Sequence, residues 1–142
     1  MMLNIHSWWA YLVLGFLIIA TINAVTGLTG KRDFTDKDLR ISLFTLIVTH
    51  IQLVIGFIWY FMSPYFSALT SNGGEVMKNS ATRLLAVEHP LMMLIAIACI
   101  TVGWSKHKKK TEDAAKFKTI AIFYGLGLLF VLSRIPWSNW FN

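Results

Sequence analysis

Four long apolar stretches, separated by polar segments, run through this sequence of 142 residues. They cover about residues 8–25, 41–62, 84–104 and 119–135. Each is close to the roughly 20 residues that a helix needs to cross the hydrocarbon core of a bilayer. We therefore predict an all-α fold in which residues 1–142 form one integral membrane domain, a four-helix up-and-down bundle.

The composition supports this assignment to the membrane. Hydrophobic residues make up 56% of the chain and charged residues only 14%, which is too apolar for a soluble domain of this size. The formal charge of +6 is carried by segments between the apolar stretches, so it predicts membrane topology and not nucleic-acid binding. The single cysteine, Cys99, excludes a disulfide framework and a CxxC metal motif.

Lysine and arginine are distributed unevenly among the polar segments. Residues 26–40 hold four of them and residues 105–118 hold six, whereas residues 65–83 hold two. By the positive-inside rule, the first and third connections would be cytoplasmic. We therefore expect a multi-pass membrane protein with both termini in the periplasm or at the cell exterior.

Local signals predict where the helices begin, end and bend. Thr35 or Asp36 could cap the second helix, and Pro64 would end it. Asn72–Gly73–Gly74 predicts a turn in the long polar connection between the second and third spans. Pro90 would remove one backbone hydrogen bond and kink the third helix. Aromatic residues predicted at the membrane interfaces are Trp8, Trp9, Trp59, Tyr60, Trp137 and Trp140.

Three histidines, His6, His50 and His89, lie within or at the ends of apolar stretches. Two imidazoles that face inward from different helices are what a bis-histidine haem b requires. We interpret His50 and His89 as the metal ligands, although their heights, counted along the helices, differ by about 10 Å. His6–His89 is the competing pair, and ordinary helix packing with hydrogen-bonded histidines is the alternative. His107, in the lysine-rich connection, is expected to be solvated.

Two charged residues belong to the same half of the bundle as these candidate ligands. Arg134 could hold haem propionates, pair with Glu88, or extend to the membrane interface. Glu88 could relay protons or accept a hydrogen bond from a ligand imidazole. A weaker hypothesis is a copper or zinc site that uses His6, His89 and Glu88.

Small and polar residues line another face of the second span and part of the fourth. Thr45, Thr49, Gln52 and Gly56 are typical of contacts between membrane helices, with Gln52 as a weaker candidate for contact with a quinone. Gly125 and Gly127 likewise predict close approach of a neighbouring helix.

The segments 49–64, 77–110 and 116–137, together with His6–Ser7, resemble a family of small four-span, cytochrome b-like membrane proteins of Bacteroidota. The patterns TH-x-QL-x-IG and EH-x-x-MM-x-IA carry the resemblance. It implies a haem-binding integral membrane protein in which His6, His50 and His89 are the matching positions. Where the family has HSGLRW, this chain has HSWWAY, and the missing arginine gives Arg134 more weight.

Taken together, these features predict a membrane-embedded haem b protein that transfers electrons, with quinol or a respiratory protein as its partner. Such a protein would act with other membrane subunits and not as an independent enzyme, and the sequence has no nucleophile constellation or phosphate loop. The alternative is a non-redox accessory subunit of a larger membrane complex, whose histidines donate hydrogen bonds between helices.

Overall fold

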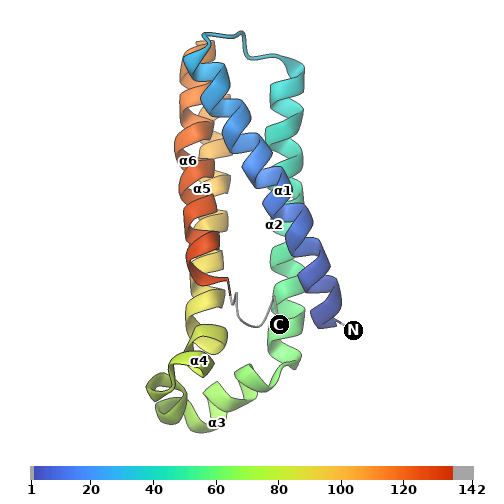
Figure 1. Ribbon diagram of the computed structural model, residues 1–142, viewed down its shortest axis with the longest axis vertical. Helices are drawn as coiled ribbons and strands as arrows, with labels where there is room; N and C mark the ends of the chain where they lie inside the picture. The colour runs from blue at the N-terminus through green and yellow to red at the C-terminus, as the bar shows by residue number, and fades with distance from the viewer. Residues whose placement is uncertain (1, 136–142) are drawn as a thin grey trace.

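The predicted all-α bundle is confirmed by the structure, a computed structural model that describes residues 2–135. Four long helical segments run antiparallel, each packed against the next, and the last packs against the first (Figure 1). The predicted interface residues Trp137 and Trp140 lie outside the described residues. The elements are α1 (Met2–Thr29), α2 (Asp36–Met62), α3 (Pro64–Lys78), α4 (Ser80–Arg83), the π-helical turn η1 (Leu84–Glu88), α5 (His89–Lys108) and α6 (Asp113–Arg134).

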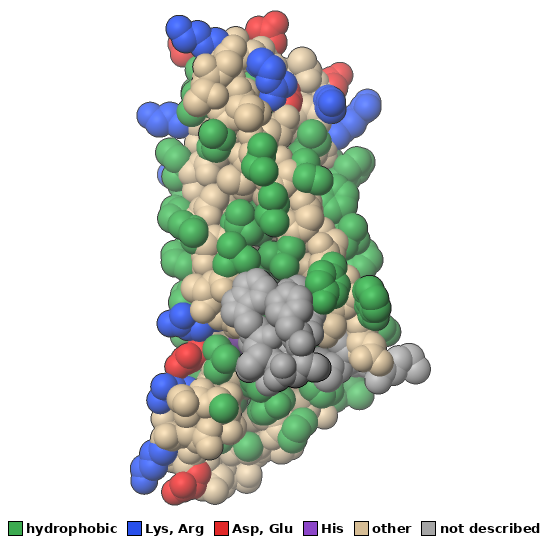
Figure 2. Space-filling view, viewed as in Figure 1, with side chains coloured by type: hydrophobic (Ala, Val, Ile, Leu, Met, Phe, Trp, Pro, Cys, Tyr) green, Lys and Arg blue, Asp and Glu red, His purple; other side chains and the backbone are tan. Residues whose placement is uncertain are grey.

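All four long segments are long and apolar enough to cross a membrane. Large apolar side chains point outward from each of them, among them Ile22, Val54, Leu94 and Leu129. Figure 2 shows such side chains over the middle of one face, with Lys and Arg gathered at the upper end. We call this end, which carries the connections 30–35 and 109–112, the basic end. An apolar outer surface of this extent identifies a multi-pass membrane protein.

Small residues let α5 and α6 pack closely. A Cβ added at Gly103 would collide with the Cβ of Phe123, and one added at Gly127 would lie 2.8 Å from the Ile100 side chain. The close approach predicted at Gly127 is therefore confirmed. The same prediction for Gly125 is wrong, because an added Cβ there would make an ordinary contact of 3.8 Å with Thr21.

Four side-chain hydrogen bonds join α1 to α2 along most of their length. In hydrocarbon such bonds tie helices together because water does not compete for the polar groups. The predicted packing role of Thr45 is confirmed by one of them. The four bonds are Gln52 Nε2 to His6 O (2.9 Å), Trp9 Nε1 to Val48 O (2.9 Å), Thr45 Oγ1 to Phe16 O (3.2 Å) and Asn23 Nδ2 to Asp38 Oδ1 (2.8 Å).

Thr35 is the N-cap of α2, as predicted. The carboxylate of Asp38, which is 1% exposed, accepts hydrogen bonds from the Thr35 backbone N–H at 2.9 Å and from its hydroxyl at 3.0 Å. Arg32 lies 3.6 Å from the same carboxylate. These contacts satisfy a buried charge and fix the start of α2 at the basic end.

The expectation that His107 is solvated is wrong. Its side chain is 1% exposed and packs against the rings of Phe34 and Trp104, whose centroids lie 5.5 and 4.6 Å from its own. The Nδ1 atom donates to the Trp104 carbonyl at 2.6 Å. The neighbouring lysines are exposed, but His107 occupies the inward side of the last turn of α5, where the α1–α2 connection covers it.

The long polar connection between the second and third spans is mostly helical and not a loop. α3 crosses the end of the bundle opposite the basic end, which we call the α3 end (Figure 1). The turn signal at Asn72–Gly73–Gly74 appears as a break inside α3, where Asn72 has φ −153° and ψ 51°. Residues 65–83 therefore form a helical cap on this end of the bundle.

The third span contains an irregular turn just before Pro90. The π-helical turn η1 ends with the His89 N–H bonded to the Leu84 carbonyl, five residues earlier. Pro90 has no N–H for the Ala86 carbonyl, to which a residue at position 90 would donate in a regular α-helix. The hydroxyl of Tyr60 on α2 donates to that carbonyl instead, at 2.6 Å. Of the two effects predicted for Pro90, the lost backbone bond is present and is replaced from a neighbouring helix. The kink stays a prediction.

Replacing Tyr60 with phenylalanine should therefore lower the stability of the protein by about 1 kcal/mol, because the Ala86 carbonyl would lose its donor in an apolar environment. The measurement is the unfolding midpoint in detergent micelles. Tyr65→Phe is the control, since no hydrogen bond of its hydroxyl is found within residues 2–135. Equal midpoints for the two variants would contradict the role given to Tyr60.

Candidate functional site

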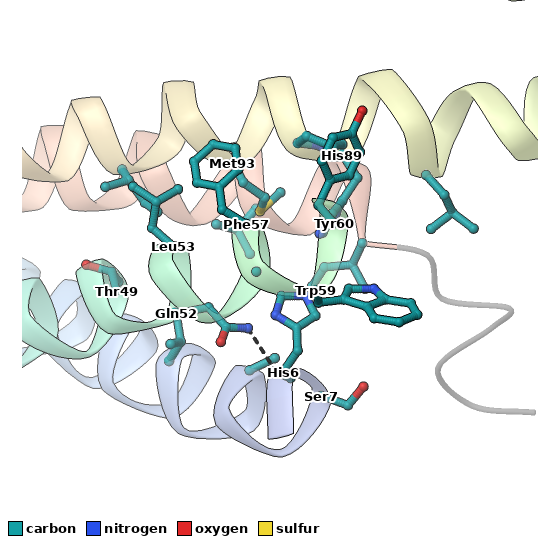
Figure 3. A pocket seen from close by; sticks show the side chains of 18 of the residues that line it. His6, Ser7, Thr49, Gln52, Leu53, Phe57, Trp59, Tyr60, His89 and Met93 are labelled. Atoms are coloured by element: carbon teal, nitrogen blue, oxygen red, sulfur yellow. Dashed lines mark hydrogen bonds between the residues drawn. The ribbon is translucent and has the colours of Figure 1, made fainter. Parts of the chain in front are cut away.

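A cavity of about 260 Å³ lies inside the bundle near the α3 end. Residues from α1, α2, α5 and α6 line it, and most of its wall is apolar. Figure 3 shows side chains from α1, α2 and α5 around the space. Apolar pockets with a few convergent polar groups are typical ligand sites. The polar side chains of the wall include His6, Ser7, Thr49, Gln52, Tyr60 and His89.

His6 from α1 and His89 from α5 come together at this cavity. Their ring centroids are 6.2 Å apart, and the ring planes are nearly perpendicular, at 82°. A metal–imidazole bond is about 2 Å long, and a ring centroid lies about 1 Å behind its nitrogen. Two imidazoles on opposite sides of one ion would thus have centroids about 6 Å apart. The separation of His6 and His89 matches that requirement.

The hydrogen bond of His89 assigns its tautomer. Its Nδ1 lies 2.8 Å from the carbonyl oxygen of Arg134 on α6. A carbonyl can only accept, so Nδ1 carries the hydrogen and donates it. In the neutral imidazole, Nε2 then keeps its lone pair. Metal-binding histidines commonly have this arrangement, with the second nitrogen bonded to a backbone carbonyl.

Two buried polar atoms at the cavity lack a hydrogen-bond partner among the described residues: His6 Nδ1 and Gln52 Oε1. The other end of the Gln52 amide is occupied, because Nε2 donates to the His6 carbonyl at 2.9 Å. Gln52 therefore contacts α1 and also lines the cavity. Unpaired buried groups are uncommon and often mark a functional site.

His50, the histidine first favoured as a ligand, is not brought to the cavity. Its side chain is exposed on α2, where Nδ1 donates to the Leu46 carbonyl at 2.8 Å and Nε2 lies 3.3 Å from Thr101 Oγ1. Thr101 follows His89 by twelve residues on α5, a distance of roughly 18 Å along the axis. His50 and His89 are therefore too far apart to share one iron.

Glu88 and Arg134 form an ion-pair network beside the cavity. Glu88 accepts from Arg83 Nε at 2.7 Å, and its other oxygen lies 3.6 Å from Arg134 Nε. The pairing of Arg134 with Glu88, one of the predicted alternatives, is thus present. Within residues 2–135, no group of three His, Cys, Asp or Glu side chains could hold a metal ion. The hypothesis of a copper or zinc site built from His6, His89 and Glu88 is not supported.

The role of Tyr60 was missed by the sequence-based prediction, which placed it only at the membrane interface. Its hydroxyl donates to the backbone carbonyl of Ala86 in η1, four residues before Pro90, and its ring lines the cavity. The signal was present in the sequence, because a proline inside a span leaves a carbonyl that needs a donor from elsewhere.

Comparison with known proteins adds no assignment to this site. No protein-family model, curated protein or solved structure matches the chain. The interpretation of the cavity therefore depends on the chemistry of its own residues.

Proposed function

We propose that this protein is a membrane-embedded haem b protein that transfers electrons, with His6 and His89 as the axial ligands. The observation that carries the proposal is the pair of imidazoles, from two different helices, with centroids 6.2 Å apart at one apolar cavity. A haem needs only two ligands from the protein, because the macrocycle supplies the remaining nitrogens. Two histidines with no third ligand among residues 2–135 suit this cofactor better than a bare metal ion.

The surroundings of the two histidines are consistent with this cofactor. Arg134 holds His89 through its carbonyl, so that the Nε2 lone pair of His89 is available. Leu53, Phe57 and Met93 give the cavity an apolar wall that would exclude water from a flat macrocycle. Bound haem would supply one-electron redox chemistry.

Arg134 is also the proposed partner of the haem propionates. Its side chain is 40% exposed, and its Nε lies 3.6 Å from Glu88. The ion pair with Glu88 therefore leaves part of the guanidinium accessible to another carboxylate. The planar guanidinium suits carboxylates. Arg134 would thereby act on both sides of the site, through its carbonyl toward His89 and through its guanidinium toward the cofactor's edge.

The topology and the partner belong to the same proposal. The positive-inside rule would put the basic end in the cytoplasm and the cavity in the periplasmic half of a bacterial inner membrane. Both termini would then be periplasmic. A quinol or a respiratory protein could exchange electrons with a haem at this depth.

A non-redox accessory subunit is the second candidate function. The observation that favours it is that two histidines already join helices: His89 donates to Arg134 on α6, and His50 Nε2 lies 3.3 Å from the Thr101 hydroxyl on α5. In that case the histidines would serve packing alone, as polar groups often do between membrane helices.

An absorption spectrum of the purified protein separates the two functions. We expect the protein, produced in cells with sufficient haem, to show a Soret band and an α-band that sharpens on reduction. A pyridine haemochrome assay should give about one haem b per chain, as one bis-histidine pair implies. A folded, monodisperse and colourless protein that takes up no added haem would exclude the cytochrome.

A further inference from the structure

Gln52 stands out among the residues of the cavity because, within residues 2–135, only the nitrogen of its side-chain amide is hydrogen-bonded. Its Nε2 donates to the His6 carbonyl at 2.9 Å, whereas its Oε1 is buried and has no partner within the described part of the chain. His6 Nδ1 is likewise buried and has no hydrogen-bond partner among the described residues. Figure 3 shows the Gln52 amide beside the His6 imidazole at the cavity. Two orphaned polar atoms thus lie on neighbouring side chains.

The chemistry of the two atoms is complementary. The bond to the His6 carbonyl fixes the amide orientation, because the opposite orientation would place two acceptor oxygens against each other. Gln52 therefore offers an acceptor, Oε1, toward its surroundings. An imidazole Nδ1 can match it only by carrying a hydrogen, and in the neutral ring that leaves the lone pair on Nε2.

We propose that Gln52 is a positioning residue for His6. Gln52 Oε1 and His6 Nδ1 are not bonded to each other in this structure. A rotation that brings them together would let Oε1 accept a hydrogen bond from His6 Nδ1, which leaves His6 Nε2 free to bind a metal. This inference rests on the proposed function as far as the metal is concerned. Gln52 then does for His6 what the Arg134 carbonyl does for His89, where the equivalent Nδ1 bond is already 2.8 Å long. Both ligands would be fixed through Nδ1, one by a side chain and one by the backbone.

The tautomer of His6 can be measured without haem. In haem-free protein labelled with ¹⁵N-histidine, we expect the imidazole shifts of His6 to report Nδ1–H in the wild type, and a mixture of both tautomers in Gln52→Leu. The His6 signal is assigned by its loss in His6→Ala. A wild-type signal from the Nε2–H form, or an unchanged Nδ1–H signal in Gln52→Leu, would overturn the inference.

Trp9→Phe is the matched control for a merely structural effect. It removes another α1–α2 hydrogen bond of 2.9 Å, from Trp9 to Val48, but leaves Gln52 and His6 intact. We expect its His6 signal to stay in the Nδ1–H form. The same mixture in Trp9→Phe as in Gln52→Leu would show that loosening of the helix pair, and not the lost acceptor, controls the tautomer.

The haem-loaded protein provides the second test, through its midpoint potential. A stronger acceptor on Nδ1 makes the ligand more basic and favours the ferric state, so Gln52→Glu should shift the potential to more negative values. Gln52→Leu should shift it to more positive values. Shifts of the same sign, or no shift in either variant, would contradict a positioning role. If the wild type binds no haem, the proposed function fails, while the tautomer measurement still decides the role of Gln52.

Discussion

Replacing His89 with alanine is expected to abolish haem binding, with the haem content of the purified protein falling at least about 10-fold. The variant loses one proposed ligand and also leaves the Arg134 carbonyl without its donor. His6→Ala should have the same effect, because His89 is then the single proposed ligand that remains at the cavity. The measurement is the ratio of pyridine haemochrome to protein, with circular dichroism to confirm that the helices are intact.

His50→Ala is the matched control for this experiment. It removes a histidine from the same membrane bundle, but one that is bonded to Leu46 and Thr101 and lies outside the cavity. We expect its haem content to equal that of the wild type. Loss of haem in His50→Ala together with normal haem in His6→Ala would contradict the ligand pair proposed from the structure.

The second large effect is expected from Gly103→Ala on α5. The added methyl group would collide with the Cβ of Phe123, an atom that cannot move unless the backbone of α6 moves with it. Overpacking of this kind in a tight interior typically costs about 1–3 kcal/mol. We therefore expect a lower free energy of unfolding, measured by denaturation of the protein in mixed micelles.

Gly15→Ala supplies the comparison, because apart from the adjoining backbone of α1 no atom of the described residues lies within 4 Å of the Cβ that it would add. Its stability should be unchanged or slightly higher, since alanine is a better helix former than glycine. If both variants lost the same stability, the α5–α6 contact at Gly103 would not be the cause.

The fold was largely predictable because apolar stretches of span length leave few alternatives in a membrane. The ends of the helices were less predictable from the sequence. α2 begins at Asp36, five residues before the predicted span, and α5 continues to Lys108. Hydropathy detects the part of a helix that crosses hydrocarbon, whereas the polar turns beyond it are helical because capping and backbone bonding continue.

The candidate site was predicted only in part. His6 and His89 were already named as a competing pair, and their separation of 6.2 Å now favours them. The heights estimated for His50 and His89 differed by about 10 Å, but the structure separates them by roughly 18 Å. Counting residues from the ends of the spans could not decide which histidines lie close together. Their separation depends on how far each helix extends and on which side of its helix each histidine faces.

The π-helical turn η1 controls the rotational register of the third span. A π turn contains one residue more than an α turn, and each residue turns an α-helix by about 100°. Because η1 lies directly before His89, that extra residue sets the direction of every side chain in α5 relative to α4. A chain with one residue fewer between Leu84 and Glu88 could keep α4 in place only by turning the His89 imidazole away from His6.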